Sequence, residues 1–335
     1  MDNPKRVLLI QLKRAGDVIV TTPVLPALRR ALPQARIDFL VDKLFAPLLE
    51  NNPFVNDIRI YDRTNLWATW RTLRAASYDW IFDFQSSPRS ILAGLFSGAR
   101  RRAGYRLPFW GMFFNHSIRR PGNDVSATEG KMKLVRSLLW PVDAPGERQI
   151  FLTDSERKWA TDYMREKNGD QRAIGLVPTH RRQSRRWTAE SFAALARLFL
   201  SQGHPVWLMW GPGEEAYVSA IQRQVPESRM IPPTSLRQLA SLLEKCQVVI
   251  ANDNGPMHVA TAVGTPTVTI YGPTEPASWN PGGSRHRVIQ ATGLSCLGCN
   301  LNACPFGHEC MTWVKPERVF QEAQNLAFGS AVGTR

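Results

Sequence analysis

The sequence predicts an α/β protein built from two Rossmann-like, doubly wound domains that face each other across a cleft. Strand-like apolar runs alternate with helix-like amphipathic runs in both halves of the chain. This alternation is typical of parallel βαβ units with helices on both faces of a sheet. The length of 335 residues is also too great for one typical core and suits two domains.

In the first half, apolar runs with the length of strands are separated by helix-like segments. We expect strands at 6–12, 36–41, 57–61 and 78–84, and helices at 18–32 and 67–76. The second half repeats this alternation. There we expect strands at 173–178, 205–211, 247–253 and 267–272, and helices at 188–203, 214–225, 235–246 and 256–264. The region from 140 to 170 is richer in Pro, Gly and charge and is the expected domain junction.

Composition limits the class of protein. The hydrophobic content of 43% and the charged content of 21% are those of a soluble globular protein. No apolar run approaches the roughly 20 residues that a membrane-spanning helix needs. The N-terminal residues enter a strand-like run without a signal-peptide cleavage pattern, so we expect a cytoplasmic protein.

The formal net charge is +14, and part of the excess is local. Residues 84–140 hold ten Lys or Arg against two acidic residues. Such a basic field favours nucleic acid, a phosphorylated glycan or an anionic membrane surface, unless it is only a solvated face. The aromatic segment 107–114, "LPFWGMFF", lies inside this stretch. It fits a membrane-surface patch or, equally, a buried helix under a basic rim.

Loops that follow strands are the expected sites of chemistry, because ligands of doubly wound sheets bind beyond the carboxyl ends of the strands. The loop 178–187 crowds four arginines before a helix that Thr188 can cap. This loop is expected to be either a phosphate clamp or a solvated basic loop. In the next loop, Glu214 and Glu215 either complement a helix dipole or accept hydrogen bonds from ribose hydroxyls.

The loop 252–258 reads "NDNGPMH" and precedes a helix-like run. Gly255 allows close approach of the backbone to a ligand, and His258 falls in the first helical turn, where N–H groups can hold a phosphate. Asp253 would repel a phosphate. It is better suited to accept from the hydroxyls of a sugar, although local capping is its alternative role. The loop therefore suggests a ligand in which a sugar is joined to a phosphate.

In the first domain, Asp17 follows Gly16 after the first strand. It can cap the next helix, act as a general base, or do both. Several common motifs are missing from the sequence: a Walker A loop, a G-x-G-x-x-G after the first strand, a G-x-S-x-G elbow and a D-x-D pair. These absences disfavour a P-loop NTPase, a dinucleotide dehydrogenase, and a diphosphate held by a metal on a D-x-D motif.

Four of the five cysteines cluster near the C-terminus with the spacing C-x2-C-x4-C-x5-C. The spacing suits a structural zinc or iron site, and reduced, packed thiols are the alternative. The four residues are Cys296, Cys299, Cys304 and Cys310.

Four segments, in this order, resemble the ADP-heptose:lipopolysaccharide heptosyltransferases of glycosyltransferase family nine. They are "RAGDVIVTTPVLPALRRALPQARIDFLV", "SRRWTAESFAALA", "NDNGPMHVATAVGTPTVTIYGPTEP" and "CLGCNLNACPFGHECM". The resemblance implies a GT-B fold. Residues 1–165 would form an acceptor-binding domain and 171–315 a nucleotide-sugar-binding domain. The C-terminal segment 316–335 would pack back on the N-terminal domain.

The resemblance also assigns roles to residues. Asp17 matches the family's proposed catalytic base, and Glu215 matches the acid that contacts the ribose. Asp253, Gly255 and His258 match residues around the heptose and the diphosphate. The donor-binding candidates together are Thr179, Arg185, Glu215, Asp253, Asn254, Gly255 and His258. Arg185 stands where the family usually has Lys, and Asn254 stands where it usually has Ser or Thr.

Arginines of the basic stretch are candidates for facing the acceptor or the membrane. They are Arg100, Arg101, Arg102, Arg106, Arg119 and Arg120. The resemblance implies inverting transfer of heptose from ADP-L-glycero-D-manno-heptose to the Kdo- or heptose-bearing inner core of lipopolysaccharide. This would occur at the cytoplasmic face of the inner membrane, with no cofactor required for catalysis and no nucleic acid as partner. The alternatives are a transferase for another nucleotide sugar and a non-catalytic nucleotide-sugar-binding protein.

Overall fold

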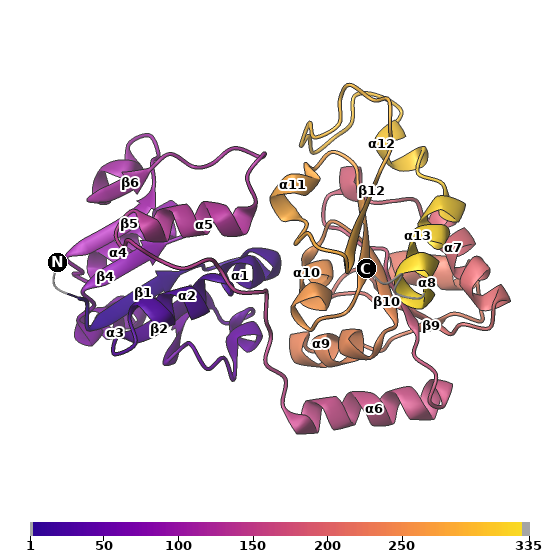
Figure 1. Cartoon of the computed structure of the whole chain (residues 1–335), viewed down its shortest axis with the longest axis horizontal. Coiled ribbons are helices and arrows are strands. Elements are labelled where there is room, and N and C mark those ends of the chain that lie inside the picture. The colour runs from indigo at the N-terminus through magenta and orange to yellow at the C-terminus, as the bar shows by residue number, and fades with distance from the viewer. Residues whose placement is uncertain (1–2, 330–335) are drawn as a thin grey trace, which may run out of the picture. The chain divides into compact units, whose positions relative to one another are not determined.

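The computed structural model describes residues 3–329. The chain divides into two compact units, Met1–Phe151 and Leu152–Arg335. Each unit contains a six-stranded sheet in which every paired strand is parallel (Figure 1). The predicted fold class, an α/β protein with two doubly wound sheets, is confirmed.

The first sheet has the strand order β3-β2-β1-β4-β5-β6. Its strands are β1 (Arg6–Ile10), β2 (Arg36–Asp42), β3 (Asp57–Tyr61), β4 (Trp80–Asp83), β5 (Arg101–Tyr105) and β6 (His116–Ile118). Residues 7–10 of β1 are fully buried because helices cover both faces of the sheet. The strand order reverses between β1 and β4, so the loops after these two strands flank the position where such sheets bind ligands.

The helices of the first unit are mostly short. They are α1 (Ala15–Thr21), α2 (Val24–Ala31), α3 (Leu66–Ala76), α4 (Pro88–Phe96) and α5 (Ala127–Arg136), with 3₁₀ turns η1 (Ala46–Leu49) and η2 (Trp110–Phe113). The single helix expected at 18–32 is divided into α1 and α2 at Pro23, which has no N–H to continue the hydrogen-bond ladder. Helix α5 packs against α1 and α2.

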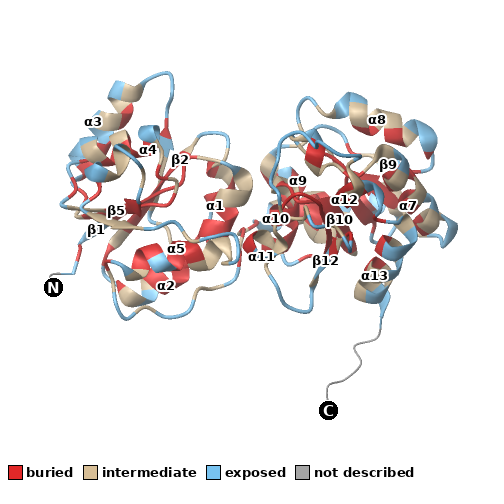
Figure 2. Ribbon diagram, turned by 90° about the horizontal axis from the view of Figure 1, so that it is seen from above, coloured by how far each residue is buried: buried red, intermediate tan, exposed pale blue. Residues whose placement is uncertain are grey.

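The second sheet has the order β12-β11-β10-β7-β8-β9, which is the same topology repeated. Its strands are β7 (Ile174–Val177), β8 (Val206–Leu208), β9 (Arg229–Met230), β10 (Val248–Asn252), β11 (Thr267–Tyr271) and β12 (His286–Gln290). Here the order reverses between β7 and β10. Figure 2 shows buried residues concentrated on β10 and on the helices that cover it, such as α10.

Eight α-helices of the second unit are described, and most of them cover its sheet. They are α6 (Asp154–Asn168), α7 (Ala189–Ser201), α8 (Glu215–Gln224), α9 (Leu236–Lys245), α10 (Gly255–Ala262), α11 (Pro276–Trp279), α12 (Glu309–Thr312) and α13 (Pro316–Phe328), with the 3₁₀ turn η3 (Gln183–Arg185). Within residues 3–329, no helix has both the length and the hydrophobicity needed to cross a bilayer.

The boundary between the units differs from the expectation. Helix α6, which we placed in an N-terminal domain of 1–165, packs along α9 of the second unit, where Arg237 pairs with Glu156. Helix α13 packs against α7, and Val319 and Ala323 are fully buried in the second core. The apolar face of α13 is therefore used within the second unit, and the expectation that 316–335 packs on the N-terminal domain stays a prediction. Residues 330–335 lie outside the described residues.

Candidate active site

The candidate donor site lies at the reversal point of the second sheet. Strands β7 and β10 pair in parallel there, with Ala251 opposite Val177. The two loops that leave these strands, 178–187 and 253–254, therefore emerge side by side at the carboxyl edge. They carry most of the predicted donor-binding residues, and side-chain hydrogen bonds join them.

Asn252 is a functional candidate that the sequence analysis missed. This residue ends β10 and is fully buried. Its Oδ1 accepts from the Trp187 amide at 2.9 Å, and its Nδ2 donates to the Pro178 carbonyl at 2.8 Å. The one side chain thus fixes both ends of the 178–187 loop. An amide that ends an apolar strand just before "DNG" was the available signal.

Asn254 makes the second link. It is the N-cap of α10, with Oδ1 accepting from the Met257 amide at 2.9 Å, while Nδ2 donates to the Thr179 carbonyl at 2.8 Å. A Ser or Thr hydroxyl could cap the helix, but the amide also reaches the neighbouring loop. Both ends of the side chain are thus engaged within the protein, and Thr179 itself is buried.

Arg185 and Asp253 form an ion pair, with Nη1 and Oδ2 3.3 Å apart. Their side chains are only 16% and 6% exposed, so the pair lies largely out of water. Burial lowers the pKa of Arg185, and the neighbouring Arg182 and Arg181 lower it further, against the effect of Asp253. The buried Nε of Arg185 has no hydrogen-bond partner among the described residues. The guanidinium therefore has one donor that no described residue uses.

The start of α10 supplies further donors. Gly255 occupies the first helical position, and His258 lies in the first turn with 3% exposure. The His258 ring packs 6.0 Å from the Trp279 ring of α11. N–H groups at a helix start attract anions, and here they adjoin the Arg185–Asp253 pair. A cationic donor, a carboxylate and a helix start at one edge suit a sugar joined to a phosphate.

The two glutamates after β8 have different surroundings. Glu214 is the N-cap residue of α8, and its Oε2 accepts from the Gly211 amide at 2.9 Å. Glu215, the predicted ribose contact, is exposed at the first position of α8. Because β8 pairs with β7, Glu215 lies at the same carboxyl edge as the donor site. Its carboxylate is not bonded directly to the Arg185–Asp253 pair.

The four cysteines converge on one side of this site. Cys296, Cys299, Cys304 and Cys310 line one small apolar cavity together with His308. Burial, followed by the neighbouring thiols, raises the pKa of Cys310 to about 11. Within the described part of the chain, no group of three or more His, Cys, Asp or Glu side chains is arranged to hold a metal ion. The structure thus brings the predicted cysteines together without the geometry of a metal site.

This cysteine-containing segment is fastened to the donor loop. His308 Nε2 lies 2.6 Å from the Ser184 carbonyl, and the Ser184 hydroxyl donates to the Leu301 carbonyl at 2.9 Å. The Asn300 side chain accepts from both Arg185 and Arg182. The segment therefore supports the conformation of the loop that carries Arg185.

In the first unit, Asp17 lies at the corresponding carboxyl edge, after β1. It occupies the third helical position of α1, so it is not the N-cap residue. Its Oδ2 accepts from the Arg14 amide at 3.3 Å, which is one half of a capping box. The side chain is partly exposed and can still be reached by a ligand.

The structure separates the six predicted acceptor-facing arginines into two groups. Arg100, Arg101 and Arg102 lie at the amino end of β5, where Arg101 covers the Trp80 ring and Arg102 donates to the carbonyls of Phe113 and Ala99. The other three follow the carboxyl ends of β5 and β6, on the edge that carries Asp17; they are Arg106, Arg119 and Arg120. The six arginines therefore do not lie together at one edge of the sheet, because the length of β5 stands between the groups.

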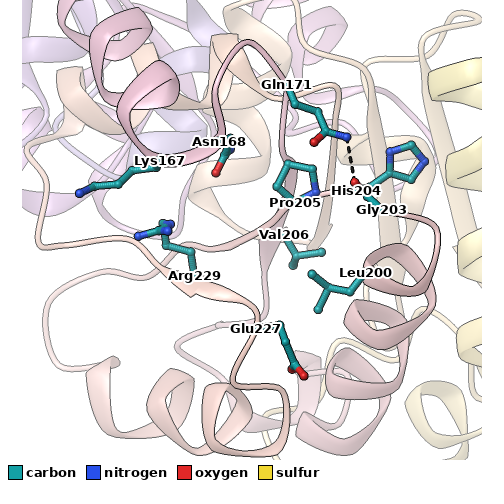
Figure 3. A pocket seen from close by; sticks show the side chains of 10 residues that line it. All are labelled: Lys167, Asn168, Gln171, Leu200, Gly203, His204, Pro205, Val206, Glu227 and Arg229. Atoms are coloured by element: carbon teal, nitrogen blue, oxygen red, sulfur yellow. Dashed lines mark hydrogen bonds between the residues drawn. The ribbon is translucent and has the colours of Figure 1, made fainter.

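A different pocket, of about 280 Å³, opens at the amino end of β8 (Figure 3). Lys167, Glu227 and Arg229 contribute to its lining, and Gln171 donates to the Gly203 carbonyl at 2.8 Å. This end of the sheet is opposite to the loops that carry the candidate residues. The pocket is therefore separate from the candidate donor site.

The chain is similar to known heptosyltransferases. Residues 66–309 match the family described as glycosyltransferase family 9 (heptosyltransferase). The chain is 25% identical over 354 residues to lipopolysaccharide heptosyltransferase 2 of Escherichia coli strain K12, which covers 96% of this chain and 98% of the relative. It is 31% identical over 170 residues to lipooligosaccharide heptosyltransferase 2 of Campylobacter jejuni serotype O:6, which covers 48% of this chain and about half (53%) of that relative.

A solved structure shares the fold. The structure of the E. coli ADP-heptose lps heptosyltransferase II superposes with a TM-score of 0.80 at 24% identity, over 96% of this chain and 98% of that one. The two six-stranded parallel sheets thus form a GT-B fold. Because the family match covers well over half of the sequence, the chain belongs to glycosyltransferase family 9, the heptosyltransferases, and is a glycosyltransferase.

Proposed function

We propose that the protein transfers heptose from ADP-L-glycero-D-manno-heptose to the inner core of lipopolysaccharide, with inversion at the anomeric carbon. One observation carries the proposal at the level of the site: the buried Arg185–Asp253 pair beside the start of α10. A phosphate site alone would not retain the carboxylate. The names of the relatives, lipopolysaccharide and ADP-heptose heptosyltransferases, support the choice of substrates.

The second unit is the proposed donor-binding domain. The Arg185 guanidinium and the N–H groups near Gly255 and His258 would hold the diphosphate, and Asp253 would accept from heptose hydroxyls. Thr179 and Asn254, which are joined by a hydrogen bond, would shape this edge. Glu215 would contact the ribose. Negative charge grows on the diphosphate as its bond to the anomeric carbon breaks. Donors already in place stabilise such charge, so the proposed reaction does not require a metal.

The first unit is the proposed acceptor-binding domain, with Asp17 as the general base. Asp17 takes the proton of an acceptor hydroxyl while that oxygen bonds to the anomeric carbon and ADP leaves from the opposite face. The inner core of lipopolysaccharide is anionic, and Arg106, Arg119 and Arg120 lie at the same edge of the sheet as Asp17. These arginines would attract and orient the acceptor.

The test is a transfer assay with ADP-heptose and a panel of truncated lipopolysaccharide acceptors, following ADP release and the glycan product. The variant Asp17→Asn keeps an oxygen that can accept from the Arg14 amide but cannot take a proton. It is expected to abolish transfer while leaving ADP binding, measured by calorimetry, unchanged. Asp124→Asn, at an exposed acid of the same unit, is the control. Normal turnover by Asp17→Asn would remove Asp17 from the mechanism.

We also propose that the segment after β5 binds the anionic cytoplasmic face of the inner membrane. Phe109 and Met112 are 89% and 79% exposed, and the exposed Arg106 precedes them. Apolar tips beside basic groups suit a surface of anionic lipid. The double variant Phe109→Ser/Met112→Ser is expected to lose co-sedimentation with phosphatidylglycerol vesicles, while Leu44→Ser, at another exposed apolar residue, retains it. Equal binding of both variants would refute this part.

For the four cysteines we propose a structural role: holding segment 296–310 against the loop that carries Arg185. Packed thiols do this directly, and a zinc or iron ion would do it by drawing the thiolates together. Elemental analysis of anaerobically purified protein measures the metal content. The variant Cys310→Ser is expected to lower ADP affinity in either case. Unchanged ADP affinity and unchanged thermal stability would contradict the structural role.

A further inference from the structure

Gln85 joins the segments that follow three strands of the first sheet. It lies just after β4, and each of its polar groups has a partner. Its side-chain Oε1 accepts from the Lys13 amide at 3.0 Å, in the loop after β1. Its backbone carbonyl accepts from Arg120 Nη2 at 3.1 Å, in the segment after β6. Its backbone amide and its Nε2 donate within its own loop, to Asp83 Oδ1 at 3.0 Å and to Ser87 Oγ at 3.2 Å.

The loop that carries Gln85 is itself held firmly. Asp83 is 1% exposed, and its Oδ1 also accepts from the Ser86 amide at 2.8 Å. Ser86 has a φ of 49°, in the left-handed region that residues other than glycine rarely adopt. Its hydroxyl donates to the Asp83 carbonyl at 2.9 Å and accepts from the Tyr105 amide of β5 at 2.8 Å, which holds this conformation. The backbone of Gln85 is thus fixed by the ends of β4 and β5, independently of the loop after β1.

The backbone at Lys13 leads directly to the proposed base. The Lys13 carbonyl accepts from Gln11 Nε2 at 2.7 Å, and the next amide, that of Arg14, donates to Asp17 Oδ2 at 3.3 Å. The Asp17 carboxylate is therefore bonded to the backbone amide that follows the one held by Gln85. Loss of the bond between Gln85 and the Lys13 amide would let this backbone move, and the carboxylate would move with it.

We propose that Gln85 is a positioning residue for the glycosyl transfer: its side-chain carbonyl holds the Lys13 amide and thereby keeps the Asp17 carboxylate in place. This inference rests on the proposed function, in which Asp17 is the base. Gln85 acts through the backbone of segment 13–17 and need not touch either substrate. Because a misplacement of a reacting group by about 1 Å can lower a rate about 100-fold, loss of this remote bond is expected to lower kcat.

The test compares two substitutions of the Gln85 side chain in the full-length protein. Gln85→Met has a similar length but no oxygen, so the Lys13 amide loses its acceptor. Gln85→Glu keeps an oxygen for the Lys13 amide, and the Ser87 hydroxyl can donate to the new carboxylate. Neither substitution alters the backbone bonds to Asp83 and Arg120. Turnover is measured as ADP release per ADP-binding site, with the concentration of sites taken from calorimetry.

Gln85→Met is expected to lower kcat about 10- to 100-fold, with the KM for both substrates and the affinity for ADP unchanged. Gln85→Glu is expected to recover most of the kcat. Gln34→Met, the same substitution at an exposed glutamine of the first unit, is the matched control and is expected to behave as the wild type. A kcat for Gln85→Met equal to that of the control overturns the proposal, and so does an equal loss of kcat in Gln85→Met and Gln85→Glu.

Thermal unfolding shows whether each variant is folded. Gln85→Asn takes the place of Gln85→Met if the latter does not fold. Its side chain is one methylene shorter, so its oxygen ends short of the Lys13 amide, and the same loss of kcat is expected. A folded Gln85→Asn with the kcat of the wild type overturns the proposal.

Hydrogen–deuterium exchange tests the anchoring separately from catalysis. Exchange of the amides in segment 11–18 reports the opening of local hydrogen bonds. It is expected to be faster in Gln85→Met than in the wild type and in Gln85→Glu. Unchanged exchange in Gln85→Met overturns the proposal even if kcat falls. Failure of the proposed function has a different signature, because Asp17→Asn would then remain active while Gln85→Met still accelerates exchange.

Discussion

The variant Asn252→Ala tests whether one buried amide holds the donor loop. It removes the acceptor of the Trp187 amide and the donor to the Pro178 carbonyl, at 2.9 and 2.8 Å. Both of these residues are buried, so water does not readily replace the lost bonds. Each buried polar group left unpaired costs about 1–3 kcal/mol, which gives about 2–6 kcal/mol for the two.

The assay is thermal unfolding of the full-length protein with and without ADP. For a unit of this size, 1 kcal/mol corresponds to about 2–4 °C in Tm, so a loss near the middle of the range lowers Tm by about 8–16 °C. ADP affinity is expected to fall as well, because the loop that carries Arg185 loses both anchors. Asn325→Ala, at an exposed position of α13, is the control and is expected to stay within about 0.5 kcal/mol of the wild type.

The variant Asn252→Asp separates the two hydrogen bonds. Its carboxylate can still accept from the Trp187 amide, but it places negative charge against the Pro178 carbonyl. It is therefore expected to destabilise the second unit as well. A Tm for Asn252→Ala within about 2 °C of the wild type, with unchanged ADP affinity, would refute the anchoring role of Asn252.

Three further variants test other parts of the structure. Arg185→Ala removes the cation that is paired with Asp253 and proposed to hold the diphosphate. It is expected to weaken ADP binding about 10- to 150-fold by calorimetry, from about 1.5–3 kcal/mol for a charged hydrogen bond. Arg237 holds the pKa of Glu156 at about 2, below the value of about 4.3 in an unfolded chain. The difference in Tm between wild type and Glu156→Gln is therefore expected to be full at pH 7 and to vanish as the pH falls from about 4.5 to 2. In Gly272→Ala the new Cβ would meet the Met311 Sδ, and thermal unfolding is expected to show a loss of about 1–3 kcal/mol.

The alternation of apolar runs was sufficient to predict the class of fold, because strands buried on both faces are apolar throughout. The strands that were missed lack this signal. Strands β6 and β9 lie at sheet edges and have only three and two residues, and β12 is an exposed edge strand. Strand β5 is internal but begins with two arginines. Its polar start conceals it from a search for hydrophobic runs.

The six arginines of the basic stretch were predicted as one set because they are close in the sequence. Arg102 and Arg106 are four residues apart, but most of strand β5 lies between them. At about 3.3 Å per residue this separates the two by about 13 Å, and it places them at opposite edges of the sheet. Most of the predicted donor-binding residues come together in the structure, because the loops after parallel strands share one edge. The hydrogen bonds of Asn252 and Asn254 depend on which strands are neighbours, and that pairing is not visible in the sequence.

The two sheets share one further feature at their reversal points. Asp83 ends β4, and Asp253 directly follows β10, the strand in the equivalent position of the second sheet. Each aspartate is buried near a cation, Lys131 for Asp83 and Arg185 for Asp253. At a reversal point the flanking loops diverge and leave space that polar groups can occupy. The same topology thus places an acidic and a basic side chain at both reversal points. In the second unit the cation pairs directly with the aspartate, with Arg185 Nη1 3.3 Å from Asp253 Oδ2. In the first unit Lys131 donates to Gln11, and Asp83 accepts from backbone amides. A paired cation and carboxylate at the reversal point suit a sugar joined to a phosphate, which is why we propose the second unit as the donor-binding one.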